Sequence, residues 1–164
     1  MAKYSLSYVN VDPEEITVNV ADPIKAVVCG ASASVAISEI YIAGEESASA
    51  VTELVVNRPS VQGAPYANFQ TPERLNPFSQ AASGWQAAGQ VGGLTGTVGA
   101  ARPTFSANDI LNLTLNCFAG VVRWVAPPGS EIIATGSGLP GEVTFGGSRG
   151  GTGNVSGHVI VEQL

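Results

Sequence analysis

The residues most suggestive of catalysis are 146–150 (GGSRG), which fit the G-x-S-x-G nucleophile pattern, with His158 close by in the sequence. That motif requires a strand before the serine, a helix after it and a histidine oriented by an acid. Residues 151–154 (GTGN) follow instead, and such a glycine-rich string does not propagate a helix. We interpret the segment as a glycine-rich turn and predict no catalytic residue and no enzymatic activity.

Glycine-rich loops can also bind phosphates or dinucleotides, and this chain has two candidates. Residues 146–154 lack the terminal Lys-Ser/Thr of a phosphate-binding loop, and 92–100 (GGLTGTVGA) have the wrong glycine spacing for a dinucleotide site. We therefore predict no bound cofactor.

Adjacent carboxylates occur at Glu14-Glu15 and Glu45-Glu46, on expected turns. A glycosidase needs two carboxyl groups that face each other across a cleft, and neighbours in sequence on a turn diverge. We interpret both glutamate pairs as charged residues that lie on turns and are exposed to solvent. A Ca²⁺ site built from Asp12 with Glu14 and Glu15 is an open alternative for a β-sandwich, but the ligand spacing of an EF-hand is missing.

Two cysteines, Cys29 and Cys117, each lie in a β-like run. Buried thiols acting as small apolar side chains are the favoured interpretation. A disulfide between them is an open alternative if their strands face each other. With one histidine and no C-x-x-C or H-E-x-x-H motif, we predict no metal site.

The composition of the chain excludes further classes of function. The 164 residues suit one domain. The net charge of −6, with seven scattered Lys and Arg residues, argues against nucleic-acid binding. No apolar run approaches the roughly 20 residues of a membrane span, and the first residues do not resemble a secretory signal, so we expect synthesis in the cytoplasm. Only 12% of residues are charged, which predicts a surface that either consists largely of Gly, Ser, Thr and Ala or is covered by partners.

The elements that position these residues are strands. Residues 121–135 (VVRWVAPPGSEIIAT) hold two short β-like runs on either side of Pro127 and Pro128, and two prolines cannot sit in a paired central strand. This predicts a strand, a tight bend and a second strand, with Trp124 packed on a sheet face. The chain is therefore expected to be an all-β sandwich or barrel.

Alternation defines further strands. In residues 109–118, four apolar side chains in strict period two are expected to face inward: Leu111, Leu113, Leu115 and Cys117. In residues 3–11, Tyr4, Leu6 and Tyr8 share one face. The last strand is expected over 158–163, with His158 as a polar residue where it opens.

Residues 34–43 and 50–58 are separated by a short polar turn, which predicts an antiparallel hairpin. Strict alternation would place Val35, Ile37, Glu39 and Tyr41 on one face of the first strand, and Ala36, Ser38, Ile40 and Ile42 on the other. Glu39 and Arg123 each interrupt an apolar strand, and we hypothesise that they pair if their strands are neighbours.

We divide the chain into an N-terminal strand or arm (1–23) and a β domain (24–164). Within the domain, 59–108 is expected to be a long proline- and glycine-rich loop insertion with isolated aromatic residues. Loops of this length are usually functional. The aromatics either close one end of the chain's own sandwich or grip a neighbouring molecule.

Several stretches carry a family resemblance: ISEIYIAG, VTELVVNRP, LNPFSQAASGW, NCFAGVVRWVAPPGSEII and SGHVIVEQ. Together they resemble the single jelly-roll proteins of tailed bacteriophages, which include the decoration or cement proteins on the outside of the head. The resemblance covers about residues 24–164, and RWVAPPG is its most specific part. Residues 1–23 match nothing in it.

The resemblance implies an antiparallel jelly-roll sandwich and a structural role in the virion. A homotrimer would bind the major capsid protein on the outer surface of the head and stabilise it. The loop insertion supplies the candidate contact residues for these partners, which are Tyr66, Phe69, Arg74, Phe78 and Trp85. The alternative is a carbohydrate-binding β-sandwich of a tail tip or fibre, with Trp85 or Tyr66 stacked on sugar rings.

Overall fold

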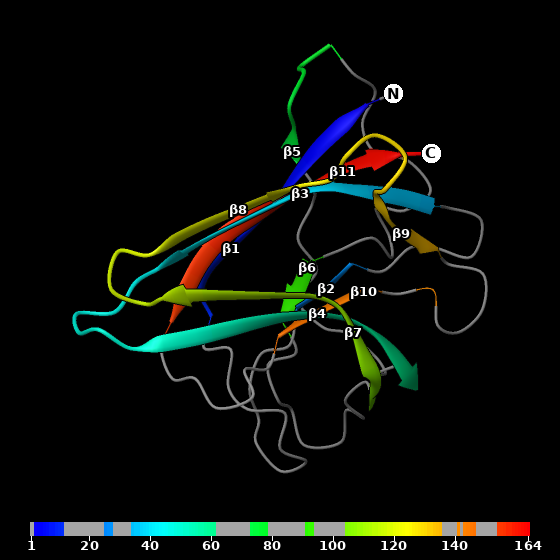
Figure 1. Ribbon diagram of the computed structural model, residues 1–164. Helices are drawn as coiled ribbons and strands as arrows, with labels where there is room; N and C mark the ends of the chain where they lie inside the picture. The colour runs from blue at the N-terminus through cyan, green and yellow to red at the C-terminus, as the bar shows by residue number, and fades with distance from the viewer. Residues whose placement is uncertain are drawn as a thin grey trace.

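The computed structural model describes residues 2–11, 25–27, 34–61, 73–78, 91–93, 104–135, 141, 143–146 and 154–164. These residues form two layers of antiparallel β-sheet and contain no helix (Figure 1), which confirms the all-β prediction. In this part of the chain there is accordingly no apolar helix of membrane-spanning length.

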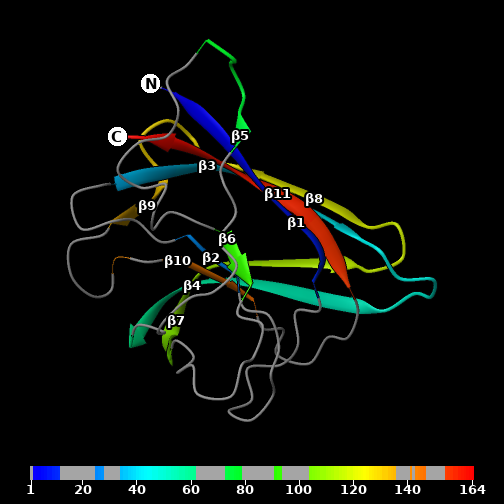
Figure 2. The same cartoon turned by 180° about the vertical axis from the view of Figure 1, so that it is seen from behind.

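Each layer is one sheet. The first sheet has the order β5 (Glu73–Arg74), β1 (Lys3–Val11), β11 (Val155–Gln163), β3 (Ser34–Gly44) and β8 (Val121–Val125), and β9 (Ile132–Thr135) also pairs with β3. The second sheet has the order β6 (Val91–Gly93), β2 (Lys25–Val27), β10 (Val143–Gly146), β4 (Val51–Val61) and β7 (Thr104–Asn116). The two ends of the chain lie side by side (Figures 1 and 2), where Gln163 N–H donates to Ala2 O at 3.2 Å.

The core lies between the sheets and takes side chains from both. Its buried members are Tyr4, Leu6, Val35, Ile37, Ile40, Ile42, Leu54, Val56, Leu115, Ile132, Ala134, Val143, Phe145, Val155, Val159 and Val161. The shared face predicted for Tyr4 and Leu6 is confirmed, since both side chains are buried in the core, whereas the side chain of Tyr8 lies outside the described ones. Trp124 is half-buried against this core, as its size requires.

The predicted hairpin of residues 34–43 and 50–58 is wrong. β3 pairs with β11, β8 and β9 in the first sheet, whereas β4 pairs with β10 and β7 in the second. The connecting residues cross from one layer to the other beside the turn that follows β7. Backbone hydrogen bonds hold this crossing, from Glu46 N–H to Cys117 O at 2.9 Å and from Cys117 N–H to Ala50 O at 2.8 Å.

Strict alternation in β3 is also wrong, because the strand contains a bulge. Ile160 lies opposite Glu39 and Val161 lies opposite Ile37, so Ser38 is the extra residue. Val35 and Ile37 face the core before the bulge, and Ile40 and Ile42 face it afterwards. The change of phase turns Glu39 and Tyr41 to the outer face of the first sheet, and thus removes a carboxylate from the core face.

The strand, bend and strand predicted for residues 121–135 are present, but the bend does not reverse the chain. Val125 lies opposite Glu39 and Ile132 lies opposite Ile37, so β8 and β9 run along the same edge of β3 in one direction. Residues 126–131 leave this edge next to Ser38. Within them Ser130 N–H donates to Pro127 O at 2.9 Å, and Gly129 has a φ of 81°.

β7 shows the predicted alternation, since Leu115 and Cys117 are buried and Asn112, Thr114 and Asn116 are exposed, while Leu111 and Leu113 are half-buried. β11 begins at Val155, so His158 lies inside the last strand and does not open it. Cys117 is a buried cysteine that takes part in no disulfide, which confirms the buried-thiol interpretation for this residue and contradicts the disulfide alternative. Cys29 itself lies outside the described residues, as do Asp12, Glu14 and Glu15.

Both predicted divisions of the chain, the N-terminal segment 1–23 and the loop segment 59–108, contribute strands to the sheets. β1, from segment 1–23, lies within the first sheet between β5 and β11. In the segment 59–108, β4 continues to Val61, β7 begins at Thr104, and the short strands β5 and β6 pair with β1 and β2. Apart from these strands and residues 75–78, that segment lies outside the described residues.

Candidate functional site

The first candidate site is a turn that projects from the edge of the first sheet. β5 pairs with β1, with Arg74 opposite Tyr4, and Leu75 N–H then donates to Lys3 O at 3.1 Å. The chain continues into a turn at residues 75–78 that extends beyond the sheets (Figure 1). We call residues 73–78 the β5 turn.

The β5 turn presents a large apolar side chain to solvent. Phe78 is 95% exposed and Leu75 is 53% exposed. Phe78 N–H donates to Asn76 Oδ1 at 3.0 Å, which is the side-chain hydrogen bond by which Asn stabilises a tight turn. Pro77 restricts the backbone between them. The local sequence therefore fixes the turn while leaving the phenyl ring without packing.

Two of the five predicted contact residues, Arg74 and Phe78, lie on the β5 turn, and both are exposed. With 95% of its surface exposed, Phe78 does not close the end of the chain's own sandwich. Tyr66, Phe69 and Trp85 lie outside the described residues. Of the predicted set, the structure thus places Arg74 and Phe78 on one turn.

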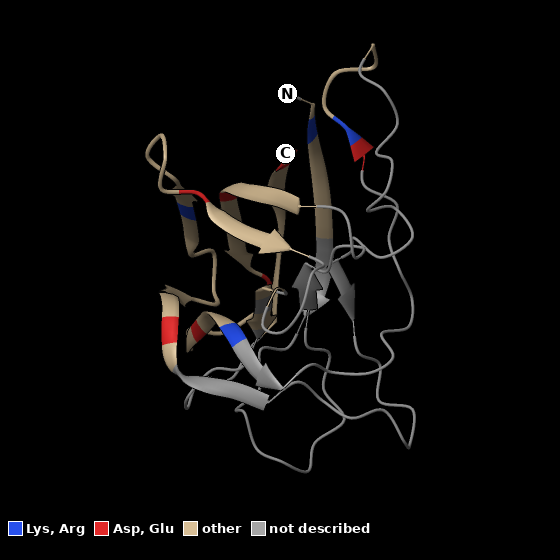
Figure 3. Cartoon of the chain, turned by 90° about the vertical axis from the view of Figure 1, so that its right-hand side faces the viewer, with Lys and Arg blue, Asp and Glu red and all other residues tan. Residues whose placement is uncertain are grey.

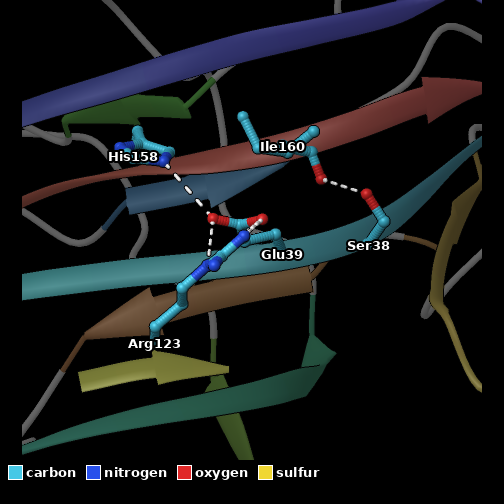
Figure 4. A network of polar contacts seen from close by, with 5 residues as sticks. All are labelled: Ser38, Glu39, Arg123, His158 and Ile160. Atoms are coloured by element: carbon cyan, nitrogen blue, oxygen red, sulfur yellow. Dashed lines mark hydrogen bonds and ion pairs between the residues drawn. The ribbon is translucent and has the colours of Figure 1, made fainter. Parts of the chain in front are cut away.

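The second candidate site is a polar cluster on the outer face of the first sheet. Arg123 of β8 donates from Nε to Glu39 Oε1 at 2.9 Å and from Nη2 to Glu39 Oε2 at 2.8 Å (Figure 4). The hypothesised pairing is confirmed, and it lies at the surface, where the Arg123 side chain is 61% exposed and that of Glu39 19%. The bulge at Ser38 makes the pairing feasible because it directs Glu39 outward.

His158 completes this cluster from β11. Its Nε2 lies 3.8 Å from Glu39 Oε1 (Figure 4), and its ring stacks on Tyr41 with centroids 5.1 Å apart and an interplanar angle of 11°. The stacking follows from the register, because Tyr41 lies directly opposite both His158 and Arg123. Sequence reasoning treated His158 alone, since its neighbours come from strands far apart in the chain.

Within this cluster, Glu39 and Arg123 favour each other's charged forms. The hydrogen bond from Arg123 lowers the pKa of Glu39, against a smaller opposing effect of desolvation, and Glu39 raises the pKa of Arg123. Glu39 therefore serves as a fixed counter-ion that orients the guanidinium. The arrangement suits recognition of another molecule through Arg123.

Exposed apolar side chains also occur away from the β5 turn. Val51 (62%), Phe118 (55%) and Val121 (57%) are exposed near the crossing between the sheets, and Val125 is 53% exposed on β8. Phe118 was not predicted as a contact residue, although the alternation that places Cys117 inward would place Phe118 outward. Figure 3 shows the charged residues of the described segments scattered over several strands.

In the described ranges, no group of three or more His, Cys, Asp or Glu side chains could hold a metal ion. Comparison of the chain with protein-family models, with curated proteins and with solved structures finds no match in any of the three.

Proposed function

We propose that this protein is a non-enzymatic jelly-roll protein of a tailed-phage virion. In this role it binds the major capsid protein on the outer surface of the head, as a homotrimer, and stabilises the shell. The proposal combines the family resemblance of residues 24–164 with two features of the fold.

The first feature is the order in which strands pair. β1 pairs with β11, β2 with β10, β3 with β8 and β9, and β4 with β7, so the chain pairs from its two ends toward its middle. If β8 and β9 are taken as one interrupted strand, and the short β5 and β6 are set aside, the described residues form eight strands in two sheets of four. A long antiparallel hairpin rolled into two layers has this arrangement, which supports the jelly-roll assignment. Viral capsid proteins and lectins both use that fold.

The second feature carries the partner-binding part of the proposal, and it is the exposure of Phe78. A phenyl ring that is 95% exposed on a turn fixed by its own sequence gains nothing for folding. Buried in a pocket of a partner, the same ring would contribute strongly, because aromatic anchors dominate interface energetics. Arg74 on the same turn supplies a polar contact next to it. The low share of charged residues agrees with a surface that partners cover.

The test is co-sedimentation of the purified protein with phage heads from which this protein has been removed. We expect retention on the heads in about 1 M NaCl, because burial of apolar surface is not screened by salt. Phe78→Ser should weaken binding by about 2 kcal/mol, or roughly thirty-fold, without changing the melting temperature. Heads that carry the protein should release their DNA at a higher temperature than heads without it.

Phe118→Ser is the matched control, because Phe118 is also an exposed phenylalanine, but it follows β7 and lies outside the β5 turn. Equal weakening by both substitutions would contradict a specific role of the β5 turn. Absence of head binding together with binding to host glycans would replace the proposal with the carbohydrate-binding alternative. That alternative depends on Tyr66 and Trp85, which lie outside the described residues.

A further inference from the structure

The outer edge of β8 has a backbone pattern that can be worked out residue by residue. Gly44 N–H donates to Gly120 O at 2.9 Å, and Ala126 N–H donates to Ser38 O at 2.9 Å, in the register that pairs β3 with β8. Opposed residues of an antiparallel ladder alternate between hydrogen-bonded and non-hydrogen-bonded pairs. Val122 and Trp124 therefore turn their backbone groups toward β3.

It follows that Val121, Arg123 and Val125 turn their N–H and C=O groups away from the sheet. β8 is the last strand in the order of the first sheet, and none of the described strands pairs with its outer side, so within the described part of the chain these groups line an unpaired edge. The same three residues have exposed side chains: 57% for Val121, 61% for the Arg123 side chain and 53% for Val125. An unpaired edge with such side chains is a template for another strand.

The opposite edge, on β7 of the second sheet, differs in chemistry. Cys117 N–H donates to Ala50 O, and by the same alternation Asn112, Thr114 and Asn116 direct their backbone groups outward. These side chains are exposed and polar, and Asn116 bonds Ser49 Oγ at 2.8 Å. β7 thus offers a polar edge, whereas β8 offers two valines with one cation between them.

Arg123 has donors to spare for a partner. Glu39 occupies Nε and Nη2 along one side of the guanidinium. A guanidinium carries five N–H donors in a planar fork, so the side formed by Nη1 and Nη2 can bind a second carboxylate in a bidentate manner. Because Glu39 already fixes the orientation of the group, binding there would cost little additional side-chain entropy.

We propose that β8 is a docking edge at which an extended segment of another protein adds as an antiparallel strand. The segment has an acidic residue opposite Arg123 and apolar residues two positions away on each side, opposite Val121 and Val125. Main-chain hydrogen bonds supply affinity, and the carboxylate–guanidinium contact supplies register and selectivity. This inference uses a different part of the molecule from the β5 turn and does not depend on the decoration role.

The test is a titration of the ¹⁵N-labelled full chain with two capped peptides, Thr-Val-Thr-Glu-Thr-Val-Thr and its counterpart with Lys in place of Glu, up to about 5 mM. We expect the Glu peptide to shift the amide signals of Val121, Arg123 and Val125, and to bind roughly ten-fold more tightly than the Lys peptide.

The edge itself is tested by Val125→Pro, with Val125→Thr as the matched control. Proline at this position removes only an outward-pointing N–H and leaves the ladder with β3 intact, whereas threonine keeps both the N–H and the β-branched shape. We expect the proline variant to bind the Glu peptide roughly five-fold more weakly and the threonine variant to bind like the original chain. If Val125→Pro does not retain the native amide spectrum, Val121→Pro, which also lacks a ladder bond to β3, takes its place.

Three results would overturn the proposal. The first is no amide shift with either peptide, which would mean that Arg123 and the neighbouring prolines only protect the edge from association. The second is equal binding of the Glu and Lys peptides. The third is self-association of the chain in sedimentation that Val125→Pro abolishes, because a second copy would then be the occupant of β8.

Discussion

Gly44→Ala tests the most unexpected feature of the fold, which is that β3 and β4 belong to different sheets. Gly44 is the last residue of β3, and its N–H donates to Gly120 O at 2.9 Å. A Cβ added at Gly44 would lie closer than 3.0 Å to the carbonyl oxygen, the carbonyl carbon and the Cα of Cys117. In a hairpin, by contrast, this residue would lead into a solvent-exposed turn, where alanine is tolerated.

The size of the effect follows from which atoms must move. All three clashing atoms are backbone atoms, and Cys117 is held in place by bonds to Ala50 and Glu46. Overpacking against a rigid neighbour costs about 3 kcal/mol. In a domain of this size, about 3 kcal/mol lowers the melting temperature by roughly 6–12 °C.

Gly129→Ala is the control, because Gly129 has open space around its Cβ position but a φ of 81°. It should cost only the strain of a left-handed alanine, about 1 kcal/mol. Thermal unfolding of the three proteins, followed by circular dichroism, gives the comparison. If Gly44→Ala destabilises the protein no more than Gly129→Ala, the close contact between the crossing and Cys117 is refuted.

Three further predictions concern single side chains. The Thr52 hydroxyl is buried and has no hydrogen-bond partner among the described residues. Thr52→Val should therefore leave the free energy of unfolding, measured in urea, unchanged or raise it by about 1 kcal/mol. A clear loss of stability would show that the hydroxyl does have a hydrogen-bond partner. Arg123 lowers the pKa of Glu39 below 4.5, so the folded state binds fewer protons than the unfolded state. The ion pair therefore stabilises the fold above about pH 4.5, and this stabilisation is lost as pH falls through the pKa of Glu39 in the folded state. The melting temperature of Glu39→Gln should therefore fall less between about pH 7 and about pH 3 than that of the original chain. An equal fall in both proteins would contradict this. Ala119 has a φ of 59°, in the left-handed region. Ala119→Gly should stabilise the protein by about 0.5 kcal/mol, because the relief of left-handed strain exceeds the greater loss of backbone entropy by glycine on folding. A lower melting temperature of the glycine variant would contradict this.

The sequence predicted the parts of the candidate sites that depend on local chemistry. Phe78 stood out as one of the isolated aromatic residues in the proline- and glycine-rich segment, and the structure places it on an exposed turn fixed by Asn76. Glu39 and Arg123 stood out as charges in apolar strands, and their pairing is confirmed. The edge of β8 could not be recognised from the sequence, because only strand order shows which strand has no outer neighbour.

The sequence alone determined that the chain is all-β, since period-two alternation and the spacing of proline and glycine act within a few residues. The tertiary structure decided which strands became neighbours: it separated β3 from β4 and brought His158 next to Tyr41. It also decided the bulge at Ser38, where alternation by itself would put Glu39 on the core face. The physical reason is that strand pairing and burial are set by contacts between residues from tens to more than a hundred positions apart, and their energies exceed the local preferences that a sequence pattern records.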